Sequence, residues 1–368
     1  MASSPTYPLL PFSQLVYDSM RWKPNVYRFT RVVRIAGGAK EKSRWQEAVC
    51  TALGNHPVFR MRIDRHGRQF EVTTKDILQG PYHRFVFATE GEDLLIRVSM
   101  SRILGDGRSV DILTEDVMRA YRGEALEQDD YWGCIEYIEQ QKCTTHYANS
   151  KLWLEEEFID TSVPVRPTTD RHLWSILPPK AGLYKDDYTD CHEKIRTLAE
   201  TQYLSMDGFF SLCAVLAIAE YCGTQTAALT WAYEGRERPE EQRVFGSLHR
   251  DIPFQIKNAK PEIINHKSDL IRQARIQIRS GIAHSDYPYT LTAPYNQRWN
   301  YAVNVLRVPD DIPLQRIAYA LLDVEIHEAD AHLAIWYRYS ATHYKKESIK
   351  KFAALIRKYA EWLLEGEN

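Results

Sequence analysis

The sequence lacks the features that mark disulfide scaffolds, redox or zinc sites and membrane-spanning segments. It has six cysteines in 368 residues, and no two of them have CxxC spacing. The longest apolar run, Leu212–Ala219, is far too short to cross a bilayer, and no Arg-rich or apolar leader opens the chain. We therefore expect a cytoplasmic protein without membrane contact, whose thiols are reduced and mostly buried.

An excess of charge of one sign is also missing. The 47 Lys and Arg residues nearly balance the 49 Asp and Glu residues, so no overall field favours nucleic acid. Several enzyme signatures are absent too: a phosphate-binding loop, a GxSxG elbow, a dinucleotide-binding glycine pattern and an HExxH helix. Composition thus argues against nucleic-acid binding, and the sequence lacks the motifs by which four large enzyme classes are usually recognised.

Strand and helix patterns alternate along the whole chain. In the first part we expect strands over Tyr27–Ile35, Phe59–Asp64, Gln69–Thr73 and Asp93–Met100, and a helix over Lys40–Leu53. In the second half we expect helices over Tyr188–Tyr203, Met206–Tyr221 and Glu347–Leu364, and strands over Ala227–Tyr233 and Ala331–Tyr339. The pattern predicts a mixed α/β fold.

A lobe boundary is predicted after the helical stretch Tyr131–Phe158. Periodicity collapses there into a Pro- and Thr-rich segment, Asp160–Thr169. We accordingly divide the chain into an N-terminal lobe, residues 1–166, and a C-terminal lobe, residues 167–368. A chain of this length can bury one core in each lobe.

The strongest candidate site follows the predicted buried strand Asp93–Met100. A loop over Ser101–Arg108 contains two glycines, and a helix then begins near Ser109 and ends at Gly123. A strand end that opens onto a loop is a common place for a binding or reactive site. The loop sequence, SRILGDG over Ser101–Gly107, carries a resemblance to a known family.

That segment has the position and spacing of the HHxxxDG motif of nonribosomal peptide synthetase condensation domains. Other segments resemble family patterns in the same order along the chain. These are Tyr7–Gln14 (YPLSPxQ in the family), His56–Met61 (RHExLRT, with Arg60 on the arginine), Ala120–Leu126 (AYxGxxL), and Gly235-Arg236, Gly246 and Pro253 (GR, then G, then LP). The resemblance spans nearly the whole chain.

The resemblance implies two chloramphenicol-acetyltransferase-like lobes in a V-shaped pseudo-dimer with a central tunnel. Its expected partners are acyl or peptidyl carrier domains upstream and downstream and a neighbouring adenylation domain. Each carrier would present a thioester on a phosphopantetheine arm, so we expect the domain itself to bind no cofactor. A monomer is expected.

The histidines of the motif are replaced here by Ser101 and Arg102. In the family the second histidine positions or deprotonates the attacking amine, or stabilises the intermediate. An arginine stays protonated and has no acceptor lone pair, so Arg102 cannot be a general base. It can stabilise an oxyanion, a contribution of about 3 to 4 kcal/mol for one donor. The alternative is an ion-paired or surface arginine on an inactive scaffold.

Three further residues are expected to shape the site. The resemblance implies that Asp106 is structural and forms a salt bridge with Arg60. Gly107 is expected to supply a turn conformation that a Cβ would hinder. Ser101 is interpreted mainly as a polar spectator, since a nucleophilic serine would need a neighbouring base.

No other histidine is identified from sequence as a replacement. None of the twelve begins the HxxxD pattern of the wider acyltransferase superfamily; His56, for example, leads to Arg60. The stretch His327–His332 is interpreted as a hairpin turn rather than a metal site. We therefore predict no metal ligands.

Three functions compete on these residues. The first is amide-bond formation between a carrier-bound acyl or aminoacyl thioester and an amine, impaired to an unknown degree by Arg102. The second is an inactive condensation-like domain that docks carriers or recruits a tailoring enzyme. The third, a free-standing acyltransferase using coenzyme A, lacks the HxxxD pattern, and heterocyclisation lacks its DxxxxD pattern.

Overall fold

The computed structural model describes residues 5–20, 27–158, 160, 162–171, 180–259, 267–289, 303–307 and 320–365. The chain forms two compact units. The first contains Met1–Cys143 and Glu234–His249, and the second contains Thr144–Tyr233 and Arg250–Asn368. This division differs from the single boundary expected between residues 166 and 167, because the segment Glu234–His249, here called the return segment, packs with the first unit.

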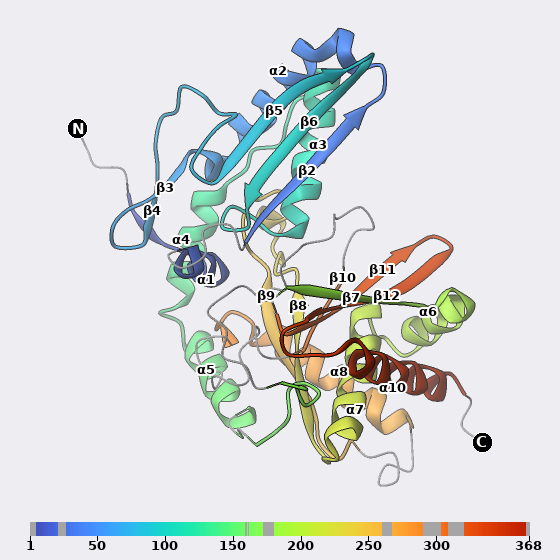
Figure 1. Ribbon diagram of the computed structural model, residues 1–368. Coiled ribbons are helices and arrows are strands. Elements are labelled where there is room, and N and C mark those ends of the chain that lie inside the picture. Colours follow the sequence, from blue (N-terminus) through green and yellow to red (C-terminus); the bar gives the residue numbers. More distant parts are fainter. Residues whose placement is uncertain are drawn as a thin grey trace. The chain divides into compact units, whose positions relative to one another are not determined.

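The first unit is a mixed α/β structure (Figure 1). Its helices are α1 (Pro11–Met20), α2 (Lys42–Asn55), α3 (Gly107–Arg122) and α4 (Tyr131–Gln141). Its strands are β1 (Tyr7–Pro8), β2 (Arg28–Ile35), β3 (Met61–Ile63), β4 (Arg68–Glu71), β5 (His83–Glu90) and β6 (Asp93–Ser101). The strands form two antiparallel sheets, ordered β1-β4-β3 and β2-β6-β5.

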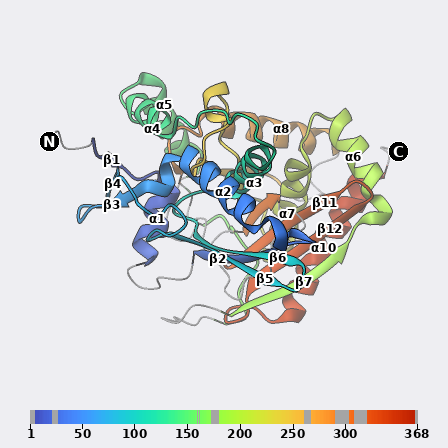
Figure 2. The same ribbon diagram turned by 90° about the horizontal axis from the view of Figure 1, so that it is seen from above.

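The central strand β6 positions the candidate loop. It pairs with β2 on one side and β5 on the other, so Ser101 at its end is placed opposite Arg28. Alternate residues Leu94, Ile96 and Met100 are buried, as expected for a strand with one face on a core. Helices α2 and α3 lie side by side over one face of this sheet (Figure 2).

The second unit is built around one six-stranded mixed sheet, ordered β7-β12-β11-β10-β8-β9. Its strands are β7 (Ala181–Asp187), β8 (Ala227–Tyr233), β9 (Arg250–Ile256), β10 (Val303–Arg307), β11 (Leu322–Ala329) and β12 (His332–Ser340). Its helices are α5 (Thr145–Glu157), α6 (His192–Thr201), α7 (Met206–Cys222), α8 (Lys267–Ala283) and α10 (Lys346–Leu364).

Helix α7 forms the centre of the second core. Every residue from Gly208 to Ala219 is buried, which agrees with its apolar composition on all sides. It packs against α10 and β8 (Figure 1). Within the described residues no single helix is both long and apolar enough to span a bilayer, although the bent pair Thr189–Thr201 and Met206–Cys222 meets the length and composition limits together.

Most of the predicted elements are confirmed, with shifts of a few residues at their ends. The helical stretch Tyr131–Phe158 is two helices, because the chain breaks at Lys142–Thr144 and Thr144 caps α5. The predicted helix stop at Gly123 is confirmed, since this glycine has φ 76° and closes α3. The hairpin within His327–His332 is confirmed as the β11–β12 turn.

Candidate active site

The candidate loop is fixed at its far end by the first turn of α3. Asp106 is the N-cap, and its Oδ1 accepts hydrogen bonds from the Ser109 backbone N (3.0 Å) and the Ser109 hydroxyl (2.9 Å). An aspartate at this position satisfies backbone donors that have no partner within the helix. The sequence Asp106-Gly107-Arg108-Ser109 therefore encodes its own helix start.

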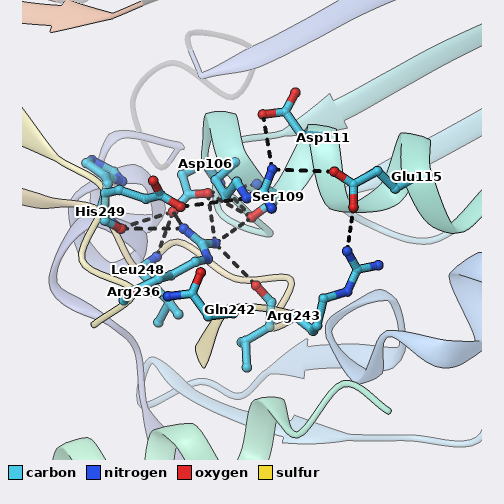
Figure 3. A network of polar contacts seen from close by, with 12 residues as sticks. Asp106, Ser109, Asp111, Glu115, Arg236, Gln242, Arg243, Leu248 and His249 are labelled. Atoms are coloured by element: carbon cyan, nitrogen blue, oxygen red, sulfur yellow. Dashed lines mark hydrogen bonds and ion pairs between the residues drawn. The ribbon is translucent and has the colours of Figure 1, made fainter. Parts of the chain in front are cut away.

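The return segment supplies the main partner of Asp106. Arg236 donates two parallel hydrogen bonds to the carboxylate, Nη1 to Oδ2 and Nη2 to Oδ1, both 3.0 Å (Figure 3). The backbone N atoms of Leu248 and His249 donate to Oδ2 at 2.9 and 3.1 Å. Asp106 and Arg236 are 6% and 5% exposed, so the pair is a buried, bidentate ion pair of the strong kind.

This pairing fixes the charge of Asp106. Burial alone would raise the pKa of the carboxyl group, but the charge and hydrogen bonds of Arg236 outweigh it, and the pKa lies below its usual range. Asp106 is therefore ionised at neutral pH, with both oxygens already bonded. Its role in the described structure is to join the loop, α3 and the return segment.

The predicted salt bridge between Asp106 and Arg60 is wrong. Arg60 ends the short 3₁₀ turn Pro57–Arg60, and its Nε donates to Glu71 at 2.7 Å while its Nη1 donates to the Gly54 carbonyl at 2.6 Å. Arg60 thus ties α2 to β4. The arginine that binds Asp106 is Arg236. The sequence identifies Gly235-Arg236 as part of a family pattern but gives Arg236 no role.

The expectation for Gly107 is also wrong, and the reason is positional. Gly107 is the first residue of α3, where a Cβ would meet nothing within 4 Å and φ is not positive. The constrained glycine is Gly105. A Cβ there would lie 2.7 Å from both Phe245 Cε1 and Ser109 Cβ, so the loop passes too close to the return segment for any side chain.

The two residues that replace the motif histidines have different environments. Ser101 is buried, and its hydroxyl accepts a hydrogen bond from the Ile103 backbone N at 3.3 Å, which agrees with a structural role. Arg102 is half-buried, and its backbone N donates to the Tyr27 carbonyl at 2.7 Å. Its guanidinium carbon lies 5.1 Å from the centre of the Phe12 ring, a cation–π distance.

Sequence reasoning missed His249, which ends the return segment beside the loop. Its ring lies 4.2 Å from the Phe12 ring, centre to centre, at an interplanar angle of 69°. Burial lowers the pKa of His249 to about 4, opposed by Asp106 and supported by the charges of Arg102 and Arg236. The imidazole is neutral at physiological pH. Only its position three residues after Gly246 marked it in the sequence.

A second buried cluster in the same unit holds His56. Its Nδ1 lies 2.7 Å from Asp129 Oδ2, and its Nε2 lies 3.3 Å from Asp116 Oδ2. Burial disfavours the imidazolium, but the two carboxylates outweigh it and the pKa of His56 is raised. Arg243 pairs with Asp116, and the Phe245 backbone N donates to Asp129 at 3.0 Å, so this cluster also holds the return segment.

The described residues contain no group of three or more His, Cys, Asp or Glu side chains placed to hold a metal ion. The stretch His327–His332 is divided between two strands. His327 lies within β11 and stacks on Trp336 with ring centres 3.9 Å apart, whereas His332 begins β12.

Similarity to known proteins agrees with this geometry. Solved structures that share the fold over nearly the whole chain include the starter condensation domain of rhizomide synthetase (TM-score 0.77, 15% identity, covering 99% of this chain and 96% of that one). The epimerization domain of the third module of tyrocidine synthetase B is equally similar (TM-score 0.76, 15% identity, covering 98% and 96%). PapA2 acyl transferase also shares the fold (TM-score 0.76, 13% identity, covering 99% and 93%). The chain therefore shares its fold with these condensation, epimerization and acyl transferase structures.

The sequence also identifies the family, which is a more specific assignment than the fold. The family described as Condensation domain matches residues 73–302, which include the candidate loop and the return segment. The chain belongs to the condensation domain family. It is also 25% identical over 232 residues to the cyclosporin synthetase of Tolypocladium inflatum, a match that covers 60% of this chain and 2% of that protein. The chain thus spans a small part of the length of this relative.

Proposed function

We propose that this domain forms an amide bond between an acyl or aminoacyl thioester and an amine, each carried on the phosphopantetheine arm of a carrier domain. The amine nitrogen adds to the thioester carbonyl carbon and the carbonyl oxygen becomes an oxyanion. The C=O bond then re-forms as the C–S bond breaks, and one amine N–H proton passes to the leaving thiolate, which gives an amide and a free thiol. The observation that carries the proposal is that the contacts holding the candidate loop in place are present. The bidentate Asp106–Arg236 pair, the N-cap of α3 and the backbone donors of the return segment are all present.

Arg102 is the proposed stabiliser of the oxyanion. Its backbone follows directly on the end of β6 and is fixed by the Tyr27 carbonyl, and its guanidinium is half-buried beside Phe12. A permanent cation with planar N–H donors suits a developing negative charge. Because a thioester is already an activated acyl group, holding the two carriers' substrates together supplies much of the remaining acceleration.

The test is a reaction with a donor and an acceptor loaded onto their carrier domains, with amide product followed by intact mass. We expect Arg102→Ala to lower the single-turnover rate by about 10² to 10³, the range for loss of one oxyanion donor. Arg102→Lys keeps the positive charge but not the planar donors, so its single-turnover rate should lie between those of the native protein and Arg102→Ala. A native protein that binds carriers and yields no amide from any pair would contradict the proposal.

The second candidate is a docking or recruitment scaffold. It is favoured by the burial of Ser101 and the loss of both motif histidines, because neither replacement can accept a proton from an amine. It predicts carrier binding that Arg102→Ala leaves unchanged and no product at any pH. The same assay therefore separates the two functions.

A further inference from the structure

One ring nitrogen of His249, beside the candidate loop, lacks a hydrogen-bond partner among the described residues. This atom, Nδ1, is buried. The residue as a whole keeps partial exposure. Buried polar atoms in folded proteins almost always have partners. Other buried side-chain atoms share this state, so the position of His249 beside the candidate loop and Arg102 is what distinguishes it.

The contact between His249 and Asp106 does not use the ring. The backbone N of His249 donates to Asp106 Oδ2 at 3.1 Å, while the carboxylate is bound on both oxygens by Arg236. The charge of Asp106 favours the imidazolium, but burial of the ring outweighs it and the pKa is lowered. His56 shows the opposite arrangement, since both of its ring nitrogens face carboxylates.

Phe12 links His249 to Arg102. The ring of His249 and the guanidinium of Arg102 both lie against the Phe12 ring, with centres 4.2 and 5.1 Å from it. Phe12 is itself buried and belongs to α1. A neutral imidazole and a permanent cation are therefore held by one aromatic side chain within a single unit of the fold.

We propose that His249 is the general base of the amide-forming reaction, in place of the imidazole that the motif lacks. This inference rests on the proposed function. As the amine nitrogen bonds to the thioester carbonyl carbon, the ring lone pair takes one N–H proton and Arg102 faces the oxyanion. Collapse of the intermediate re-forms C=O and breaks C–S, and the imidazolium returns the proton to the leaving thiolate. The products are an amide and a free thiol.

The charge state of the ring agrees with this role. Burial and the cations Arg102 and Arg236 lower the pKa of His249 to about 4, while Asp106 acts in the opposite direction. The lone pair is therefore available at neutral pH. A base with a pKa of about 4 is weaker than the ideal for neutral pH, so the role requires the ring to hold the proton only during the transfer.

The experiment compares His249→Ala and His249→Gln with the native domain in single turnovers on loaded carriers. Both changes keep the backbone N–H that binds Asp106. We expect each to lower the rate by about 10² to 10⁴, the range for general base catalysis, with unchanged affinity for the acceptor carrier and an unchanged melting temperature. Added imidazole should restore part of the rate to His249→Ala. His66→Ala, a change at an exposed histidine of the β3–β4 turn, should match the native rate.

The outcomes separate the two proposals. If the native domain and His66→Ala form amide and His249→Ala does so at the native rate, the role of His249 is overturned and the proposed function stands. A rate that falls together with the melting temperature, and that imidazole does not restore, overturns it as well by making His249 structural. If the native domain forms no amide, the proposed function fails and this inference fails with it.

Discussion

Two histidines of the first unit have pKa values shifted in opposite directions: His56, whose cluster binds the return segment, and His249, which ends that segment. His56 is bound by Asp129 and Asp116, and its pKa is raised. His249 is next to Asp106, and its pKa is lowered to about 4. Each histidine has an aspartate neighbour, and burial acts against the charged form of both rings. At His56 the carboxylates that pair with the ring outweigh burial, whereas at His249 the charge of Asp106 does not offset burial, to which the cations Arg102 and Arg236 add.

This comparison indicates that direct pairing of the ring with carboxylates decides the charge of a buried histidine. Where carboxylates pair with the ring, as at His56, they outweigh burial and the imidazole becomes a cation within the core. Where the neighbouring carboxylate is bound by an arginine on both oxygens, as at His249, burial keeps the imidazole neutral. The predictions below test the two halves of that comparison.

The largest expected effect comes from Asp106→Ala. The change leaves Arg236 as a buried cation without its anion, removes the N-cap of α3 and leaves the Leu248 and His249 backbone N atoms unpaired. We expect a loss of about 3 to 5 kcal/mol in the free energy of unfolding, measured by urea denaturation. Glu124→Ala, at an exposed carboxylate, should change stability by less than about 0.5 kcal/mol.

His56→Gln should be the next most damaging change. A glutamine amide can donate to only one of the two carboxylates, and Asp129 would then lose the cationic partner it has in the core. We expect a loss of about 3 kcal/mol, at the lower end of the range for a broken buried pair, because Arg243 still binds Asp116. Equal stability of His56→Gln and native protein would show that the carboxylates do not require a cation.

The pH dependence of stability should differ in sign for the two histidines. The folded pKa of His249, about 4, is below its unfolded value of 6.5. Its contribution is fully present above pH 6.5 and is lost as pH falls from 6.5 to 4. His56 has a raised pKa, so its contribution is present below pH 6.5 and is lost as pH rises through its folded pKa.

The check is a set of urea denaturation curves for native, His249→Gln and His56→Gln proteins between pH 4.5 and about 8.5. Relative to native protein, His249→Gln should gain stability at the acidic end, on the order of 2 kcal/mol after solvent screening of a half-buried ring. His56→Gln should lose most stability at that same end. If the free energy of unfolding of all three proteins changed with pH in the same way, the predicted difference in sign between His56 and His249 would be wrong.

The smallest effects are expected at a pair of neighbouring glycines. Gly105→Ala places a methyl group 2.7 Å from Phe245, whose ring centre is 5.2 Å from that of His56. We expect a loss of about 1 to 3 kcal/mol. Gly107→Ala meets no atom and sits in the first turn of α3, so it should stabilise the protein by about 0.5 kcal/mol. Thermal melts of the two variants give the comparison.

Local signals in the sequence were sufficient for the elements and for the position of the loop. The apolar strand pattern of Asp93–Met100, the helical spacing after Ser109 and the stop at Gly123 are all set by residues close together in the chain. The matching order of several short segments was sufficient for the family. Each of these inferences depends on neighbours within about one element's length.

The partners of the site could not be predicted in the same way. Asp106 and Arg236 are 130 residues apart, and nothing local distinguishes Arg236 from Arg60 as a partner. Gly105 is constrained by Phe245, which is also distant in the chain. His249 lies three residues after the patterned Gly246, but its neutrality depends chiefly on burial, to which Arg102 and Arg236 from different segments add. Tertiary structure alone brings these groups together.

The separation of Asp106 from Arg236 also has a consequence for synthesis on the ribosome. The first unit is incomplete until the return segment has been made, 130 residues after the loop whose aspartate it neutralises. At elongation rates of about 5 to 20 residues per second, roughly 6 to 26 s pass between the two. During that time the nascent loop carries an unpaired carboxylate, so we expect it to remain hydrated and to close only after much of the second unit has left the exit tunnel.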